Sequence, residues 1–417
     1  MKKFVCSFVA IVLCVFLIFM FAGCGGATGP TASMTPPDNS GNGGGSGGGG
    51  GSTTSLMRQV ALVSHFTPEL TAPQGGVSLQ GVDPTTGNLT QLPTNIGILG
   101  GGGVTVNPAG TFLVQVEITD LASWAVQSDG SLKQAFKLSP NPAGLPSATF
   151  TDGDREGILM HPSGQFFYYS VFTKGIAGFR LDSNGTITKL SSAPFPPDNP
   201  LVAMHPSGKF MFGDAIIGQA QGGGVGQHAI VTYNIDSATG AVSVAGQTLV
   251  GGPHSSIRVA EAHSGKFLFI SDDALSSIYT YSVNQATGLL TLASTATIAP
   301  QSPATLAVNS SDTLLYARAG SSAGRQILGF SISSDGSLHA VNSGNPVLTD
   351  PSGATIGNHI GVDLTGKFFY TAVATRSAIQ VSGFRINSDG TLSPNSTTSI
   401  PISGVAVSGL GFANFKQ

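Results

Sequence analysis

The sequence predicts an all-β protein folded as a seven-bladed β-propeller, closed by a C-terminal strand that completes the first blade. Three observations predict it. One glycine turn motif recurs seven times, a second turn motif alternates with it, and the two ends of the repeat region are complementary. The composition agrees, because only 9% of the 417 residues are charged and 58 are Gly. Such a chain is typical of short strands joined by tight turns.

The first motif is a turn in which Gly is followed two positions later by an apolar residue. Successive copies are 43 to 55 residues apart, so each copy belongs to one structural unit of about that length. Gly suits such turns because it adopts positive φ without strain. The seven glycines are Gly87, Gly130, Gly185, Gly240, Gly288, Gly336 and Gly390.

The second motif is a turn that leads into an aromatic or aliphatic strand. Two hairpins in each unit predict a four-stranded antiparallel sheet. One such sheet cannot bury both faces alone, but seven packed radially can. A sandwich would not repeat seven times, and a solenoid would leave edge strands that need caps. The strands after this motif begin at Phe112, Phe166, Phe210, Phe267, Leu314 and Phe368.

The ends of the repeat region complement each other. The first unit lacks its innermost strand and begins at residues 59–64, whereas the chain ends with an extra apolar strand at residues 405–412. We therefore expect the last strand to supply the innermost strand of the first blade, which closes the ring and removes an exposed edge.

Residues 1–23 resemble a bacterial lipoprotein signal peptide. A short basic start precedes an apolar run, and Phe21, Ala22 and Gly23 precede Cys24 in the manner of a lipobox. Acylation of Cys24 would anchor the protein to a membrane. The alternative is an uncleaved anchor, since the apolar run of about 18 residues could also span a bilayer. Both interpretations place the rest of the chain outside the cytoplasm.

Residues 24–56 are predicted to be a disordered Gly-rich tether, and residues 57–417 the propeller. Twelve of residues 25–51 are Gly, so the segment cannot bury enough apolar surface to fold. All three cysteines lie at or before position 24, so the propeller has no disulfide and no cysteine-ligated metal. Gly at position 25 favours the outer membrane, by resemblance to Gram-negative sorting patterns.

The charge balance limits the partners. A net charge of −3 with 18 basic residues is unlike a nucleic-acid-binding protein, which needs clustered cations. We expect a monomer that contacts the membrane only through its lipid and that takes a small molecule or glycan at the channel mouth. No cofactor is predicted. Carboxylates at Asp152, Asp154 and Glu156 loosely resemble calcium ligands, but the segment is too short for a known calcium loop.

The turn at residues 205–210, the strand at residues 232–236 and the following Thr239 and Gly240 resemble the lactonase-type seven-bladed β-propeller family. That family is similar to bacterial 6-phosphogluconolactonase and to cycloisomerases acting on carboxymuconates. The resemblance covers residues 57–417 and implies hydrolysis of a lactone by an exported lipoprotein. The alternative is a non-catalytic propeller of the cell envelope that binds a protein, glycan or small ligand, because the matching turns serve hairpin geometry and carry little information about activity.

Topology assigns the two faces of the disc. The turns within each blade lie on one face, here the turn face, and the longer loops and the connections between blades lie on the other, the connector face. His161 and His205 fall on the turn face, where we expect them to cap turns. Function is expected at the channel mouth on the connector face.

The resemblance implies a carboxylate after a second strand, with Arg and His from neighbouring connections. Lactone opening needs an activated water, a base and a cation for the oxyanion. Asp273 is the candidate base, and the remaining candidates stabilise charge or relay a proton. The alternative is that Asp272 and Asp273 cap a loop while Arg258 pairs with Glu261. The complete set of candidates is Asp273, Arg258, His254, Arg155, Glu156 and His359.

Overall fold

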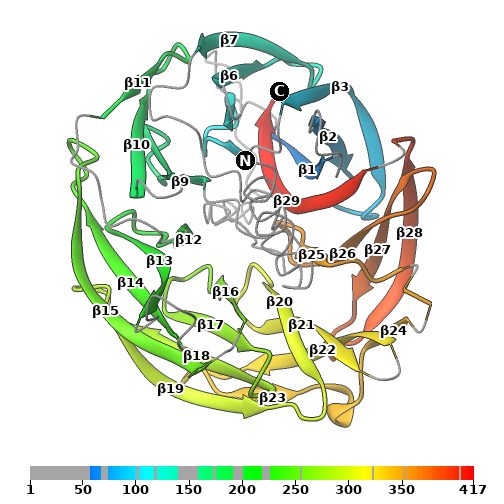
Figure 1. The fold of residues 1–417 in the computed structure, drawn as a ribbon. Helices are drawn as coiled ribbons and strands as arrows, with labels where there is room; N and C mark the ends of the chain where they lie inside the picture. Colours follow the sequence, from blue (N-terminus) through cyan, green and yellow to red (C-terminus); the bar gives the residue numbers. More distant parts are fainter. Residues whose placement is uncertain are drawn as a thin grey trace, which may run out of the picture.

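Seven small antiparallel sheets surround a central axis in the computed structural model of this chain (Figure 1). Each sheet is one blade, so the predicted seven-bladed propeller is confirmed. The structure describes residues 57–66, 74–99, 103–116, 120–139, 158–171, 175–190, 201–217, 226–253, 256–321, 324–350, 352–353, 355–402 and 405–417. The predicted signal peptide, Cys24 and the tether lie outside these residues.

Within each blade the four strands lie side by side, from an innermost strand next to the axis to a fourth strand at the outside. We number the blades from the one that contains β1. The innermost strands are β29 (Ala406–Lys416), β4 (Val104–Val106), β8 (Ile158–Met160), β12 (Leu201–Met204), β16 (Ile257–Glu261), β20 (Ser302–Val308) and β25 (His359–Val362). The second strands are β1 (Met57–Phe66), β5 (Phe112–Val116), β9 (Phe166–Val171), β13 (Phe210–Ile217), β17 (Phe267–Asp272), β21 (Leu314–Ser321) and β26 (Phe368–Ala374).

The outer half of each blade is built in the same way. The third strands are β2 (Gln74–Val82), β6 (Leu121–Val126), β10 (Gly175–Leu181), β14 (Gln227–Ile235), β18 (Ser277–Val283), β22 (Gly324–Ile332) and β27 (Ile379–Ile386). The fourth strands are β3 (Leu89–Leu99), β7 (Leu132–Leu138), β11 (Ile187–Lys189), β15 (Val242–Pro253), β19 (Leu290–Thr297), β23 (Leu338–Ala340) and β28 (Leu392–Ile400). Blade 6 adds the 3₁₀ turn η2 (Asn342–Gly344) and a fifth strand, β24 (Leu348–Asp350), which pairs with β22.

The ring closes through the C-terminal strand, as the sequence predicts. β29 pairs antiparallel with β1 from the pair Met57 and Lys416 to the pair Phe66 and Ala406 (Figure 1). The strand runs four residues beyond the predicted end at Phe412, because β1 is long enough to pair with all of it. Closure therefore joins the two ends of the propeller through backbone hydrogen bonds.

The glycines of the first motif fasten each blade to the one before it. Six of them have φ between 70° and 88°, and their carbonyl oxygens accept a hydrogen bond from a hydroxyl of the preceding blade. These contacts between blades explain why the motif recurs once per blade. The donor and acceptor pairs are Ser123 and Gly185, Tyr168 and Gly240, Thr232 and Gly288, Ser294 and Gly336, Tyr316 and Gly390, and Tyr370 and Gly87.

The turn-face histidines do cap turns, and they also join blades. The backbone N–H of Ser163 donates to Nδ1 of His161 at 3.1 Å, so Nε2 carries the proton and donates to the Gly208 carbonyl at 2.9 Å. His205 repeats this arrangement with the Gly265 carbonyl at 3.1 Å. Burial lowers the pKa of both imidazoles, which favours the neutral ring that this geometry requires.

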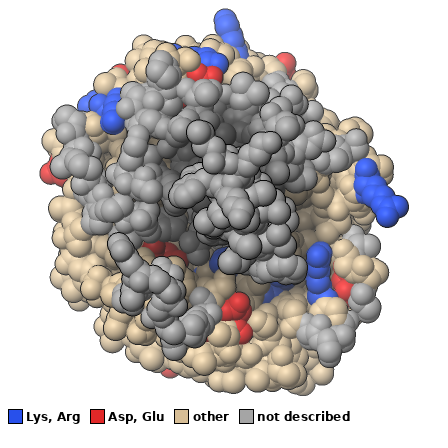
Figure 2. All heavy atoms as spheres, in the orientation of Figure 1, with Lys and Arg blue, Asp and Glu red and all other residues tan. Residues whose placement is uncertain are grey.

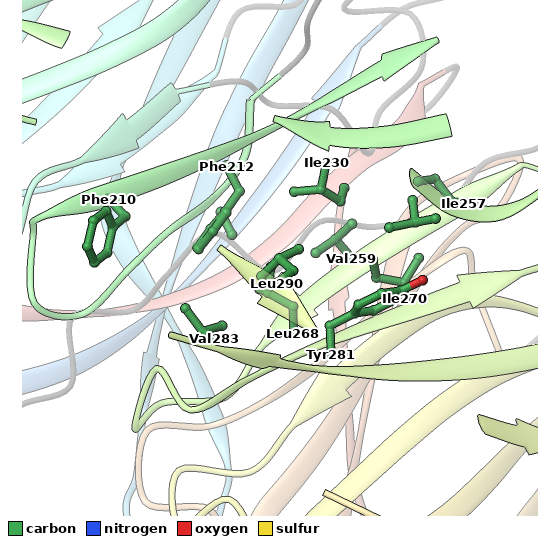
Figure 3. Close-up of a cluster of buried hydrophobic side chains, with 12 residues drawn as sticks. Phe210, Phe212, Ile230, Ile257, Val259, Leu268, Ile270, Tyr281, Val283 and Leu290 are labelled. Carbon is green, nitrogen blue, oxygen red and sulfur yellow. The ribbon is translucent and has the colours of Figure 1, made fainter. Parts of the chain in front are cut away.

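The core consists of one apolar cluster between each pair of neighbouring blades, because each strand alternates side chains toward the two blades that flank it. Between blades 4 and 5, for example, Phe212 and Ile230 pack against Ile257 and Val259 (Figure 3). No helix in the described ranges has the length and hydropathy needed to cross a membrane.

Candidate active site on the connector face

Three of the six candidate site residues lie in the described structure, all on the connector face. Arg258 is the second residue of β16, His359 is the first residue of β25, and Asp273 directly follows β17. Arg155, Glu156 and His254 lie outside the described residues, as do Asp152 and Asp154. The part of the chain that is described holds no group of three or more His, Cys, Asp or Glu side chains able to bind a metal.

Asp272 and Asp273 both bind loop backbone. Asp272 is fully buried, and its carboxylate accepts from the N–H groups of Gly252 at 2.7 Å and Leu275 at 2.9 Å. Oδ1 of Asp273 accepts from the N–H of Ser256 at 2.6 Å. The loop-capping alternative therefore describes Asp272 fully, whereas Asp273 uses one carboxylate oxygen in this way.

Arg258 does not form the alternative ion pair with Glu261. Its Nη1 donates to the Ser256 hydroxyl at 3.0 Å and to the Ile257 carbonyl at 2.7 Å. Both carboxylate oxygens of Glu261 are buried and have no hydrogen-bond partner among the described residues. The two residues are three positions apart on one strand, so their side chains leave opposite faces of it.

His359 is buried beside two cations. Its pKa is lowered to about 4, chiefly by burial; a backbone hydrogen bond at Val407 opposes this shift, and the charges of Arg318 and Arg258 add to it. The imidazole is therefore neutral at pH 7. A neutral imidazole can donate one hydrogen bond and accept another. It does not carry the second proton that an imidazolium ion would transfer to the substrate.

Arg318 and His65 belong to the site, although the sequence did not single them out as catalytic. Arg318 is the fifth residue of β21. His65 lies near the end of β1, where its ladder partner is Val407, the residue whose backbone opposes the lowering of the His359 pKa. Burial lowers the pKa of His65 as well. The second turn motif marks where each second strand begins, so counting five residues from that start in every blade could have found Arg318. Blade 1 lacks this motif, so the same count could not have found His65.

We group Asp273, Arg258, Arg318, His359 and His65 as the polar arc. Arg258 and Arg318 both act electrostatically on His359, Ser256 contacts both Asp273 and Arg258, and His65 is paired with Val407. Blades 5, 6, 7 and 1 contribute to it. In the space-filling view, a few blue and red atoms are visible at the lower margin of the grey region, over β16 and β20 (Figure 2). The two guanidinium groups of this arc can stabilise negative charge on a bound molecule.

Residues 270–406 match the family model described as "Lactonase, 7-bladed beta-propeller". The chain is similar to the lactonase-type propellers. No curated protein matches it. Among solved structures, a periplasmic gluconolactonase from Pseudomonas aeruginosa has a TM-score of 0.61 at 13% identity, covering 86% of this chain and 99% of that one. A 6-phosphogluconolactonase candidate from Bacteroides fragilis has a TM-score of 0.61 at 16% identity, covering 88% of this chain and 100% of that one. At these identities the likeness to the lactonase-type propellers concerns the fold.

Proposed function

We propose that the protein hydrolyses a small lactone at the channel mouth. The observation that carries this proposal is that Arg258 and Arg318, which come from two different blades, both act electrostatically on the buried His359. Attack of water on a lactone carbonyl places negative charge on the carbonyl oxygen, and fixed guanidinium groups stabilise that charge in the transition state. The partial match to the lactonase family and the gluconolactonase among the similar structures support the same reaction class.

Asp273 is the proposed base in this reaction. One of its oxygens is held by the Ser256 N–H, which fixes the orientation of the carboxylate. The other oxygen is the one that would take the proton of the attacking water. Arg155, Glu156, His254 and His359 complete the set of residues that we propose to contact the substrate or its charge.

The test is lactone hydrolysis followed in a pH-stat with a panel of five- and six-membered lactones. We expect wild-type turnover well above the uncatalysed rate. Arg318→Gln should lower kcat by about 100-fold or more, the usual loss for an oxyanion donor. Arg180→Gln is the matched control, since Arg180 is exposed and pairs with Asp182. Absence of turnover by the wild-type protein would exclude the proposed hydrolysis.

A second candidate function is binding of a small organic acid without turnover. It is favoured by the backbone bonds of the two aspartates, which use both carboxylate oxygens of Asp272 and one of Asp273 in loop geometry. Calorimetric titration with aldonic acids distinguishes the two functions. A pure binding protein should take up the acid with the same affinity in Asp273→Asn, and it should not hydrolyse the corresponding lactone.

We further propose that the propeller is exported and lipid-anchored through Cys24, with the outer membrane as the favoured location. The periplasmic gluconolactonase of similar fold supports a location outside the cytoplasm. The test is fractionation of cells that express the full chain. Cys24→Ser should move the protein from the membrane fraction to the soluble periplasm or should leave an uncleaved precursor. Unchanged membrane attachment of a shortened, processed Cys24→Ser protein would contradict acylation at this residue.

A further inference from the structure

The innermost strands of blades 5, 6 and 7 carry a polar residue at the same position. Arg258, Thr305 and His359 each lie nine residues before the first residue of the second strand in their blade. Blade 4 has Leu201 at this position. β20, which carries Thr305, lies between β16 and β25 (Figure 1). Thr305 therefore stands between two members of the polar arc, although its side chain is fully buried.

The hydroxyl of Thr305 binds the peptide that directly precedes His359. Its Oγ1 donates to the Asn358 carbonyl at 2.7 Å, across the boundary between blades 6 and 7. The same segment is also held within blade 7, where the N–H of Gly357 donates to Oγ1 of Thr371 at 2.9 Å. Both threonines are fully buried. The backbone that presents His359 is therefore fixed from two sides.

The part of this connection that lies further from the axis is held as well. The carboxylate of Asp350 accepts from the N–H groups of Thr355 at 2.6 Å and Ile356 at 2.7 Å. Arg325 donates to the Ile356 carbonyl at 2.8 Å. A Cβ at Gly357 would overlap a carbonyl oxygen of β26, so the backbone passes directly against that strand. The described residues before β25 thus have little freedom to move.

Ser271 makes the corresponding link one blade earlier. Its hydroxyl accepts from the N–H of Arg258 at 3.2 Å and donates to the Ala304 carbonyl of blade 6 at 2.7 Å. Ala304 directly precedes Thr305 in the chain. In both cases a buried hydroxyl of one blade binds the carbonyl just before the polar position of the next blade.

These bonds form a continuous path between two residues of the polar arc. The path runs from the backbone of Arg258 through the hydroxyl of Ser271 to the backbone of blade 6, and from the hydroxyl of Thr305 to the backbone before His359. It crosses both blade boundaries that separate the two residues. A buried polar group that loses its partner is costly, so such bonds resist displacement of the strands that they join.

We propose that Ser271 and Thr305 are positioning residues of the candidate site and that their hydroxyls set the placement of Arg258 relative to His359. This inference rests on the proposed lactone hydrolysis. Both side chains are buried, so they act through the backbone and not on the substrate. Displacing a group that stabilises the transition state by about 1 Å can lower the rate about 100-fold.

The kinetic test removes each hydroxyl with little change in side-chain volume. Ser271→Ala and Thr305→Val should each lower kcat by about 10-fold or more for a lactone that the wild type hydrolyses. KM should change by less than about 3-fold, because the displaced groups act mainly in the transition state. Thr305→Ser keeps the hydroxyl, so its kcat should lie within about 3-fold of the wild-type value.

The matched control is Thr232→Val. Thr232 is fully buried, and its hydroxyl donates to the Gly288 carbonyl of the next blade at 3.1 Å, which is the same kind of bond on the turn face. This variant should lower the melting temperature about as much as Thr305→Val does, since each leaves one carbonyl without its donor. It should leave kcat unchanged, because the turn face is remote from the polar arc.

A second measurement does not depend on turnover. The ring signals of His359 are followed by NMR at pH 7 in the full chain labelled at histidine, with His359→Gln used for assignment. Thr305→Val should shift these signals, whereas Thr232→Val should not. The signals of His161, on the turn face, should stay unchanged in Thr305→Val and serve as an internal reference.

The outcomes separate this inference from the function on which it rests. A wild type that hydrolyses no lactone overturns the proposed function, and the ring signals then decide whether Thr305 positions His359. An active wild type overturns this inference alone if Ser271→Ala and Thr305→Val lose no more kcat than Thr232→Val. Unshifted His359 signals in Thr305→Val overturn it too. If Thr305→Val does not fold, the kcat of Ser271→Ala decides by the same comparison.

Discussion

At the residue scale, one position shows how far a single side chain can depart from its repeat. In six blades, the equivalent position of the innermost strand lies six residues before the first residue of the second strand. Five of these residues are apolar and the sixth is Glu261. Burial raises the pKa of Glu261 well above its ordinary value, and the carboxylate of Asp312 adds to this. The five apolar residues are Val106, Met160, Met204, Val308 and Val362.

Replacing Glu261 with Met, the residue of blades 3 and 4, should stabilise the protein at neutral pH. The folded-state pKa exceeds the unfolded value, so stability falls as the pH rises from the unfolded pKa toward the folded pKa and stays lower above it. Glu261→Met should remove this cost, about 1–3 kcal/mol for an unsatisfied buried group. Urea unfolding at pH 4 and pH 7.5 measures it. Equal stabilisation at both pH values would contradict the argument.

His359 should produce the opposite pH dependence. Its folded-state pKa of about 4 lies below the ordinary value of 6.5. Stability is therefore full above pH 6.5 and is lost as the pH falls toward 4, by about 3 kcal/mol at 1.36 kcal/mol per unit of pKa. His359→Gln should flatten the stability profile between pH 7 and pH 4.5. A profile parallel to that of the wild type would show that His359 is not the group responsible.

At the element scale, the hydroxyl contacts between blades matter as much as the hairpins. Neighbouring blades pack face to face, so side-chain bonds to the turns of the next blade help to fix how the sheets are positioned. Tyr168, Tyr316 and Tyr370 each donate from a buried hydroxyl to a glycine carbonyl of the next blade. The tyrosine pKa values are raised by burial, which favours the protonated donor.

Phe substitutions at these tyrosines remove one hydrogen bond each and leave the ring packing intact. We expect each to cost about 1–2 kcal/mol, since the glycine carbonyl is left buried without its donor. Because the three contacts lie between different blade pairs, the losses should add in the triple variant. Tyr279→Phe, which removes no contact between blades, is the control. Thermal unfolding measures the series, and a triple variant as stable as the wild type would contradict the proposed role.

At the scale of the whole molecule, ring closure is the property on which the others depend. β29 supplies the innermost strand of blade 1, and its neighbour β25 lines the polar arc. Without β29, blade 1 would present an unpaired edge toward the axis, and Val407 could no longer support His359.

Deletion of residues 406–417 should therefore abolish cooperative thermal unfolding and expose apolar surface to dye binding. A synthetic peptide of residues 405–417 should restore the cooperative transition when it is added in excess, because the missing strand can pair with β1 in trans. A truncated protein that melts as sharply as the full chain would show that closure does not hold the ring together.

Residues of the repeat allowed most of the fold to be predicted. The seven glycines must turn the chain, and each is followed at a fixed distance by a strand, so blade number and closure follow from local geometry. The site was predicted less completely. Arg258, His359 and Asp273 were proposed through resemblance. Arg318 could have been added by counting from the second turn motif, whereas no such motif precedes His65.

The sequence by itself determined the seven blades, the closing strand and the two faces, because turns and strand alternation are local properties of the chain. Only the tertiary structure decided that Arg318 and Arg258 act on His359, that the Glu261 carboxylate has no hydrogen-bond partner among the described residues, and that Asp214 binds His228. These relations join different blades or depend on burial. Both are set by how the sheets pack around the axis, which no short stretch of residues encodes.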